Sequence, residues 1–170
     1  TIYSSNTAAE SGGAIYNTSN GDVTLTSDSL TLNSAPQRGG AINNYGLLTI
    51  GDGSLSHNVS GDGGAIATAR NLDMTDTYVN DNDALDDGGG VYNDEIGVVV
   101  VTGGTFVDNT AGDDGGALSN VDSGVMTLEF SAVSGNQAAG DGGGVHNTSA
   151  AGLNISTSLL YDNEAIGGGG

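Results

Sequence analysis

The chain has no cysteine, no tryptophan and only one proline among its 170 residues. The absence of cysteine excludes a fold held together by disulfide bonds. Aromatic residues make up 5% and all hydrophobic residues 36%, enough to line a narrow core but not a wide globular one. No apolar run approaches the roughly 20 residues that a membrane-spanning helix requires. We therefore expect no membrane span in this segment.

Basic residues are almost as scarce. Lysine is absent, and the two basic side chains, Arg38 and Arg70, stand against 21 acidic ones, which gives a net charge of −19. Binding to nucleic acid or to anionic lipid depends on clustered Lys and Arg. The composition thus excludes both as partners.

Glycine is abundant, with 31 residues, and its pairs reveal a repeat. Successive pairs are separated by 27, 24, 25, 27, 27 and 27 residues, counted at Gly12, Gly39, Gly63, Gly88, Gly115, Gly142 and Gly169. An asparagine precedes each pair, at Asn6, Asn33, Asn58, Asn82, Asn109, Asn136 and Asn163, and an apolar residue stands three positions before each of these asparagines. Such a period is typical of solenoid proteins, whose units stack on their neighbours.

A second asparagine column follows the glycines, at Asn17, Asn44, Asn93, Asn120 and Asn147, with Thr68 as the one exception. Apolar residues also recur ten and eight positions before the first asparagine, as Leu48 and Ile50 do before Asn58. This spacing of two is that of a strand, and no unit has the 3, 4, 7 spacing of an amphipathic helix. We expect strands throughout and no helices.

The columns predict an all-β fold, a parallel β-helix of about six to seven coils of 24–27 residues that forms a single domain over residues 1–170. Each unit is expected to supply three short strands. Like residues then stack, so that the asparagine columns become buried amide ladders. Neither end of the sequence resembles a cap, and we expect a piece of a longer helix or a subunit that stacks end to end.

Two motifs resemble known repeats. Phe106-Val-Asp-Asn109 followed by Gly115-Gly-Ala-Leu118 resembles the FxxN and GGA[ILV] repeats of chlamydial polymorphic outer-membrane proteins, although phenylalanine occupies only this one of the FxxN positions. The longer unit, Gly142-Gly-Gly-Val-His-Asn147 with residues 153–163, is similar to the GGGIYN repeats of secreted prokaryotic right-handed β-helix proteins. The resemblance implies a right-handed coil and a secreted or surface-displayed protein.

An acidic column offers the best candidate for a site. Aspartates immediately precede the glycines of consecutive units, at Asp62, Asp87, Asp114 and Asp141, with Asp86 and Asp113 beside them. Carboxylates stacked at strand spacing repel one another, and a hard cation with oxygen ligands would relieve that repulsion. The column predicts either a calcium site or a solvated acidic turn suited to a salty environment, and no EF-hand loop accompanies it.

Polysaccharide-cleaving enzymes built on β-helices carry acidic residues together with Arg, Lys or His on one face. The basic candidates here are Arg38, Arg70, His57 and His146, which fall in different columns. Arg38 shares the pre-glycine column with Asp62 of the next unit, which predicts an ion pair. Arg70 stands where other units mostly have glycine, and His57 and His146 are isolated, so we interpret each of the three as a surface residue. Without a positioned acid–base pair, we expect no enzymatic activity.

Threonine is frequent at outward strand positions, but only one unit, with Thr24 and Thr26, has the regular Thr-x-Thr pattern of an ice-binding face. The β-propensity of threonine explains the rest. We expect a non-enzymatic extracellular scaffold at the cell surface: a stalk, an adhesin passenger or a filament subunit. A polysaccharide-binding or polysaccharide-cleaving β-helix, with glycans as its partners, is the alternative.

Overall fold

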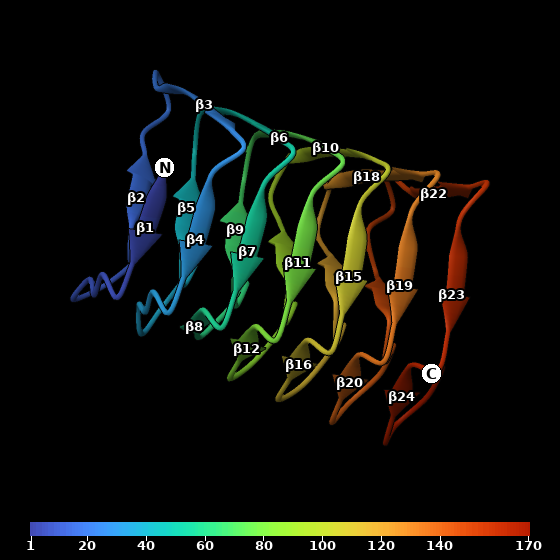
Figure 1. Ribbon diagram of the computed structural model, residues 1–170. Helices are drawn as coiled ribbons and strands as arrows, with labels where there is room; N and C mark the ends of the chain where they lie inside the picture. Colours follow the sequence, from blue (N-terminus) through green and yellow to red (C-terminus); the bar gives the residue numbers. More distant parts are fainter.

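A computed structural model describes residues 1–170 as 24 strands with no helix, and hence with no helix that could cross a bilayer. The coils lie side by side along one axis, with the N-terminus at one end and the C-terminus at the other (Figure 1). In Figure 1 the front strands run down, those behind run up, and the chain advances to the right, which is a right-handed winding. The predicted right-handed parallel β-helix is confirmed.

The strands form four parallel sheets, each named here after its first strand in the chain. The β1 sheet contains β1 (Ile2–Ser4), β4 (Ser29–Thr31), β7 (Ser54–Ser56), β11 (Tyr78–Asn80), β15 (Thr105–Val107), β19 (Ala132–Ser134) and β23 (Leu159–Tyr161). The β2 sheet contains β2 (Ile15–Asn17), β5 (Ile42–Asn44), β9 (Ile66–Thr68), β13 (Val91–Asn93), β17 (Leu118–Asn120) and β21 (Val145–Asn147). We number coils 1 to 6 by these six strands.

The β3 sheet contains β3 (Asp22–Thr26), β6 (Leu47–Gly51), β10 (Asn71–Thr75), β14 (Val98–Thr102), β18 (Val125–Glu129) and β22 (Leu153–Ser156). The β8 sheet contains β8 (Val59–Ser60), β12 (Asp83–Ala84), β16 (Thr110–Ala111), β20 (Gln137–Ala138) and β24 (Glu164–Ala165). These two-residue strands directly follow the first asparagine column, so a full coil has four strands where three were expected. They are short because the chain turns toward the glycines within a few residues.

The core is a set of apolar ladders inside the coil. Register pairs place Leu48, Leu72, Val99 and Met126 one above another along the β3 sheet. They belong to a cluster of 21 buried hydrophobic residues that runs along the axis. Each large apolar side chain buried in this way stabilises the fold by about 1.5–3 kcal/mol, and the ladder requires neighbouring coils to form.

The first asparagine column is a continuous amide ladder from Asn6 to Asn163. In each step, one side-chain oxygen accepts two hydrogen bonds from the coil before it: Asn109 Oδ1 accepts from the backbone N–H of Asn82 at 3.1 Å and from its Nδ2 at 2.9 Å. Asn109 Nδ2 also donates to the carbonyl of Val79 at 3.0 Å. The predicted burial is confirmed, since Asn109 is 0% exposed.

The second ladder is interrupted once. Asn17 Nδ2 donates to Asn44 Oδ1 at 2.8 Å, and Asn44 Nδ2 donates to Thr68 Oγ1 at 3.0 Å. Thr68 has no amide to continue the chain, so the buried Oδ1 of Asn93 in the next coil has no hydrogen-bond partner. The ladder resumes when Asn93 Nδ2 donates to Asn120 at 2.7 Å.

The glycine pairs form the corner that leads into the β2 sheet. Gly115 has φ +70°, a conformation that L side chains rarely adopt. A Cβ on Gly116 would lie 2.1 Å from the carbonyl oxygen of Gly143 in the next coil. The first glycine is thus required by the turn and the second by the close approach of stacked backbones.

Candidate functional site

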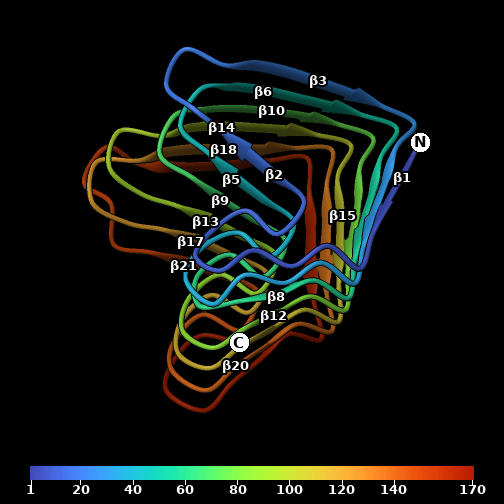
Figure 2. The same ribbon diagram turned by 90° about the vertical axis from the view of Figure 1, so that its left-hand side faces the viewer.

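The outer face of the β2 sheet lies between two rows of turns (Figure 2), and we call it the outer β2 face. The middle residue of each strand points away from the core because its neighbours point inward; these residues are Tyr16, Asn43, Ala67, Tyr92, Ser119 and His146. Asn43, Ala67 and Ser119 are nevertheless buried, with at most 3% exposure. Other side chains of the protein therefore cover much of the outer β2 face.

The side chain of Arg38 lies over the first half of the outer β2 face. Its side chain extends along the axis from the turn before β5, and Nη2 lies 2.5 Å from Oδ2 of Asp94 while Nε lies 3.6 Å from Oδ2 of Asp62. The guanidinium carbon stands 5.4 Å from the ring centre of Tyr92, a cation–π contact. The predicted Arg38–Asp62 ion pair is confirmed, and the shorter contact with Asp94 was missed.

Burial changes the acidity of these groups. It raises the pKa of Asp94 and of Asp62, against the opposing attraction of Arg38. Burial also raises the pKa of Tyr92 to about 12, with the charges of Asp62 and Asp94 adding to the effect. For Arg38, burial acts to lower the pKa, but the Asp94 carboxylate outweighs it and the pKa is raised. The guanidinium therefore stays charged and links its own coil to Asp62 and Asp94 of the two coils that follow.

The acidic column lies along one edge of the outer β2 face, and two of its carboxylates are held by backbone groups. The N–H of Asp114 donates to Oδ1 of Asp87 at 3.0 Å, and the N–H of Asp141 donates to Oδ1 of Asp114 at 2.6 Å. Burial raises the pKa of Asp87, and the charges of Asp114 and Asp113 add to this. Asp87 and Asp114 thus each bind the next coil of the column, a role that the sequence pattern did not reveal.

The predicted calcium ligands are brought into one column but not into one shell. Asp62, Asp87 and Asp114 are half-buried, whereas Asp86, Asp113 and Asp141 are exposed. No three His, Asp or Glu side chains gather closely enough to hold a metal ion. The backbone N–H bonds already satisfy part of what a cation would supply. Calcium binding stays a prediction.

His146 was interpreted as an isolated surface residue, and this was wrong. Its Nε2 lies 3.4 Å from Oδ2 of Asp114 in the coil before, and only 16% of its side chain is exposed. Its register partner on β17 is Ser119, and neither His146 Nδ1 nor Ser119 Oγ has a hydrogen-bond partner. Comparing repeat positions in neighbouring coils could have identified this contact, because His146 of one coil lies beside the acidic column of the coil before.

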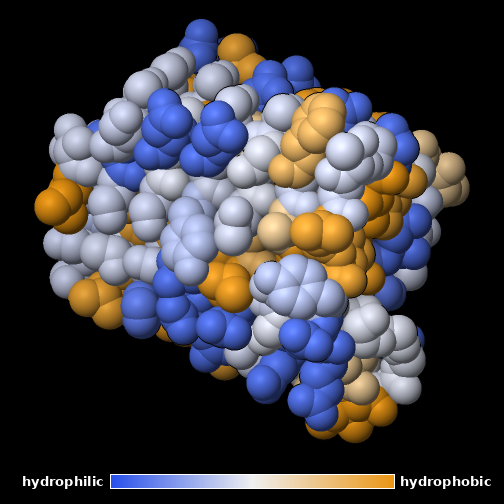
Figure 3. All heavy atoms as spheres, turned by 45° about the vertical axis from the view of Figure 1, so that its right-hand side comes forward, coloured by the Kyte–Doolittle hydropathy of each residue, from blue (hydrophilic) through white to orange (hydrophobic).

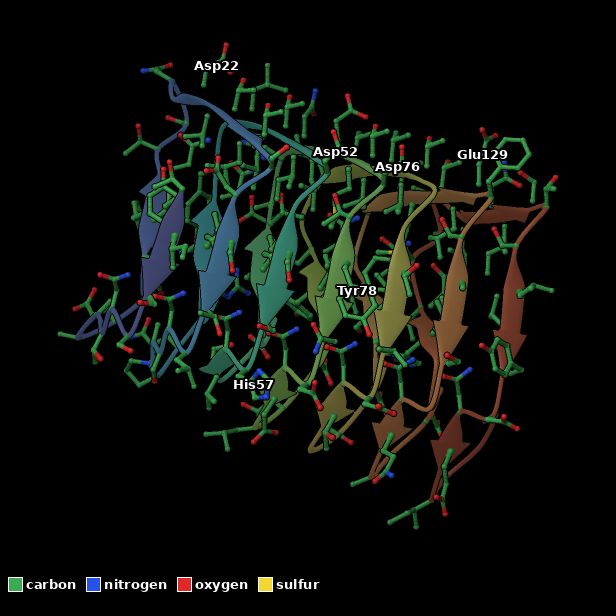
Figure 4. All side chains as sticks on the ribbon, viewed as in Figure 1. Asp22, Asp52, His57, Asp76, Tyr78 and Glu129 are labelled. Carbon is green, nitrogen blue, oxygen red and sulfur yellow. The ribbon has the colours of Figure 1, made fainter.

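Ser, His and Asp side chains together are the residue types of a nucleophilic hydrolase, but this group lacks the geometry. Ser119 is 0% exposed and its hydroxyl makes no hydrogen bond to His146. A nucleophile has to contact both its base and its substrate. The other histidine, His57, lies exposed at the corner between β7 and β8, far from this group (Figure 4).

A ridge of turns that connect the β2 sheet to the β3 sheet lies along the other edge of the outer β2 face. In coils 1, 4 and 5 these turns have four residues, at 18–21, 94–97 and 121–124, but in coils 2 and 3 they have two, at 45–46 and 69–70. The short turns leave a notch in the ridge, and Figure 2 shows the later loops reaching farther out than those of β5–β6 and β9–β10. The 24- and 25-residue units in the sequence are the ones that contain these short turns.

Two adjoining hollows occupy the notch and share Ser19 and Tyr45. One, of about 210 Å³, is lined by Ser19, Tyr45, Gly46, Leu47, Arg70 and Asn71. The other, of about 320 Å³, is lined by Tyr16, Thr18, Ser19 and Tyr45. The rings of Tyr16 and Tyr45 are 5.9 Å apart at an angle of 42°. We call this surface the ridge notch.

The family model described as the Chlamydia polymorphic membrane protein (Chlamydia_PMP) repeat matches residues 4–18. No curated protein and no solved structure matches the chain. The chain is thus a parallel β-solenoid whose repeats resemble those of the chlamydial polymorphic membrane proteins.

Proposed function

We propose that the chain is a non-enzymatic structural scaffold that lies outside the cell, at the cell surface. The observation that carries this proposal is axial continuity: the core and the first amide ladder run through every coil. A molecule of this kind is a rod whose length grows with the number of repeats. The match of residues 4–18 to a repeat of a membrane protein family supports a location at the cell surface.

Surface charge fits an extended rod. The net charge of −19 makes the sides of two rods repel one another and keeps them soluble. Binding between copies then falls to the ends, where the outermost strands are paired on one side only. A stalk, an adhesin passenger and a filament subunit are three forms that such a rod can take.

Each end of the rod offers a surface for a further coil. The last coil exposes Leu159, Leu160 and Ile166, the first exposes Ile2, and hydrophobic side chains gather at the C-terminal end in Figure 3. The outermost strands also pair on one side only. A coil in register, from flanking sequence of the same protein or from a second copy, would cover these groups.

Surface labelling tests the location. Antibodies against residues 1–170 should label intact cells of the source organism, and protease added from outside should remove the label. Labelling that appears only after the cells are permeabilised would contradict a surface scaffold.

Sedimentation of the purified chain tests stacking between copies. We expect reversible association that rises with concentration and is lost in Leu159→Asp, because the charge would lie in the end contact. Val98→Asp, on the exposed side of β14, is the matched control and should leave association unchanged. A chain that stays monomeric throughout would contradict stacking of copies and leave flanking coils to cover the ends.

A further inference from the structure

The ridge notch is the one place where the repeat is broken twice within three residues. Thr68 replaces an asparagine of the second ladder, and Arg70 stands where four of the other units have glycine, at Gly21, Gly46, Gly97 and Gly124. Both changes lie at the short turn of coil 3, which forms the floor of the notch. They bring one of the two basic side chains of the protein to this surface.

The glycines of these turns are required by different contacts. In the four-residue turn of coil 1, a Cβ on Gly21 would lie 1.9 Å from Oδ1 of Asn17. In the two-residue turn of coil 2, a Cβ on Gly46 would instead lie 2.3 Å from the carbonyl oxygen of Gly21, in the longer turn of the coil before. Arg70 also stands in a two-residue turn, but the coil before it has a short turn as well.

The change at Thr68 lowers the stability of the fold. Because Thr68 carries no amide, Asn93 Oδ1 is buried without a donor, which costs about 1–3 kcal/mol. A departure that breaks a local rule at an energetic cost is most simply explained by a function at the site. Two residues later, Arg70 adds a side chain that is 42% exposed beside Tyr45.

The notch combines aromatic and polar groups as a sugar requires. Tyr16 is 55% exposed and its ring, like that of Tyr45, borders a hollow. Arg70 Nη1 lies 3.5 Å from Oε2 of Glu95, across the turn of coil 4. A guanidinium donates and a carboxylate accepts hydrogen bonds, so the pair can bind the hydroxyls of one ring whose C–H face packs on a tyrosine.

Charge decides between classes of glycan. Arg70 is already paired with Glu95, and the rest of the surface is strongly acidic, with a net charge of −19. A polyanionic chain such as a polyuronate would be repelled, whereas an uncharged ring would not. We propose that the ridge notch binds a neutral hexopyranose oligosaccharide, with Tyr16 and Tyr45 stacking on the rings and Arg70 with Glu95 binding hydroxyls.

The proposed binding site is part of the scaffold, and binding there does not depend on whether the scaffold is located at the cell surface. It is tested on the purified chain by saturation-transfer NMR and titration with cellohexaose, chitohexaose and maltohexaose, and with a galacturonic acid hexamer as the anionic comparison. We expect at least one neutral hexamer to bind and the anionic one not to bind. Tyr45→Ala should weaken the affinity by about tenfold through loss of stacking.

Two further variants separate binding from folding. Tyr78→Ala is the control, because Tyr78 is an exposed tyrosine on the outer face of the β1 sheet, away from the notch (Figure 4). It should leave the affinity unchanged. Thr68→Asn/Arg70→Gly restores the regular ladder and should lose binding while the chain becomes more stable. No binding of any neutral hexamer, tighter binding of the anionic hexamer, or equal weakening by Tyr78→Ala would each overturn the proposal.

Discussion

Thr68 and Arg70 form a coupled pair: the hydroxyl of Thr68 donates to the carbonyl of Arg70 at 3.1 Å, in the space that an asparagine amide fills in other coils. The same hydroxyl also accepts the N–H of Arg70 at 3.4 Å. The threonine closes the turn, but it leaves Asn93 Oδ1 without the amide donor that an asparagine would supply.

The first prediction concerns this coupling. Thr68→Asn should stabilise the chain by about 1–3 kcal/mol, because Asn93 Oδ1 gains a donor and Asn44 makes the equivalent bonds to the short turn of coil 2. Urea denaturation of Thr68→Asn, Arg70→Gly and the double variant gives the coupling energy between the two positions as a double-mutant cycle. A Thr68→Asn variant no more stable than the wild type would contradict the cost assigned to the unpaired Asn93 Oδ1.

The second prediction concerns the first amide ladder. Asn109→Leu should destabilise the fold by at least about 3 kcal/mol, because the backbone N–H of Asn82 and the carbonyl of Val79 lose buried partners. Thr102→Ala, at the edge of a strand on the solvent side, should change the stability by less than about 0.5 kcal/mol. Chemical denaturation compares the two, and equal losses would show that the column contributes no more than a surface position.

The third prediction follows from the raised pKa values of Asp62, Asp87 and Asp94. An acid with a raised pKa takes up its proton more readily in the folded chain than in the unfolded one. The stability should therefore rise as the pH falls from neutral toward the ordinary aspartate pKa of about 3.9, and decline again as the pH increases through the raised values.

Melting curves between neutral and mildly acidic pH measure this dependence. Asp87→Asn keeps an oxygen for the N–H of Asp114 but removes the charge, so its melting temperature should change less with pH than that of the wild type. Asp73→Asn, on the exposed face of β10, removes one charge elsewhere and is the control. A melting temperature that falls steadily on acidification would refute the prediction.

The fourth prediction tests calcium at the acidic column. If Asp87, Asp114 and Asp141 share cations, EDTA should lower the melting temperature in low salt, and sodium chloride should restore it only in part. Calcium at the same ionic strength is the comparison that separates binding from screening. An unchanged melt in EDTA would leave the backbone N–H bonds as the whole support of the column.

The fifth prediction concerns a corner residue. Phe130 has φ +51° and is 64% exposed, in a conformation that is unfavourable for a bulky side chain. Gly103 occupies the same corner one coil earlier, with φ +71°. Phe130→Gly should stabilise the chain by up to about 1 kcal/mol, since the relief of strain exceeds the added flexibility of the unfolded state. The urea midpoint measures the effect, and Gly103→Phe should shift it the other way.

The sequence by itself determined the coil. Strand position, core and first ladder all follow from residues that recur at one spacing, because stacking places like on like at every step. Asn109 could be assigned to a buried ladder from its column alone. The strands of the β8 sheet, which follow that column, were not predicted because two residues are too few to show an alternating pattern.

Contacts between different columns were decided by the tertiary structure. Arg38 reaches Asp94 two coils away, and His146 meets Asp114 of the coil before, because side-chain length and the rise between coils set these partners. The recurrence of one residue position does not show how far a side chain reaches across the coils. The ridge notch was likewise decided by the tertiary structure: two short units are visible in the sequence, but only their position between longer turns creates a hollow, and only packing shows that Asn93 Oδ1 is left without a partner.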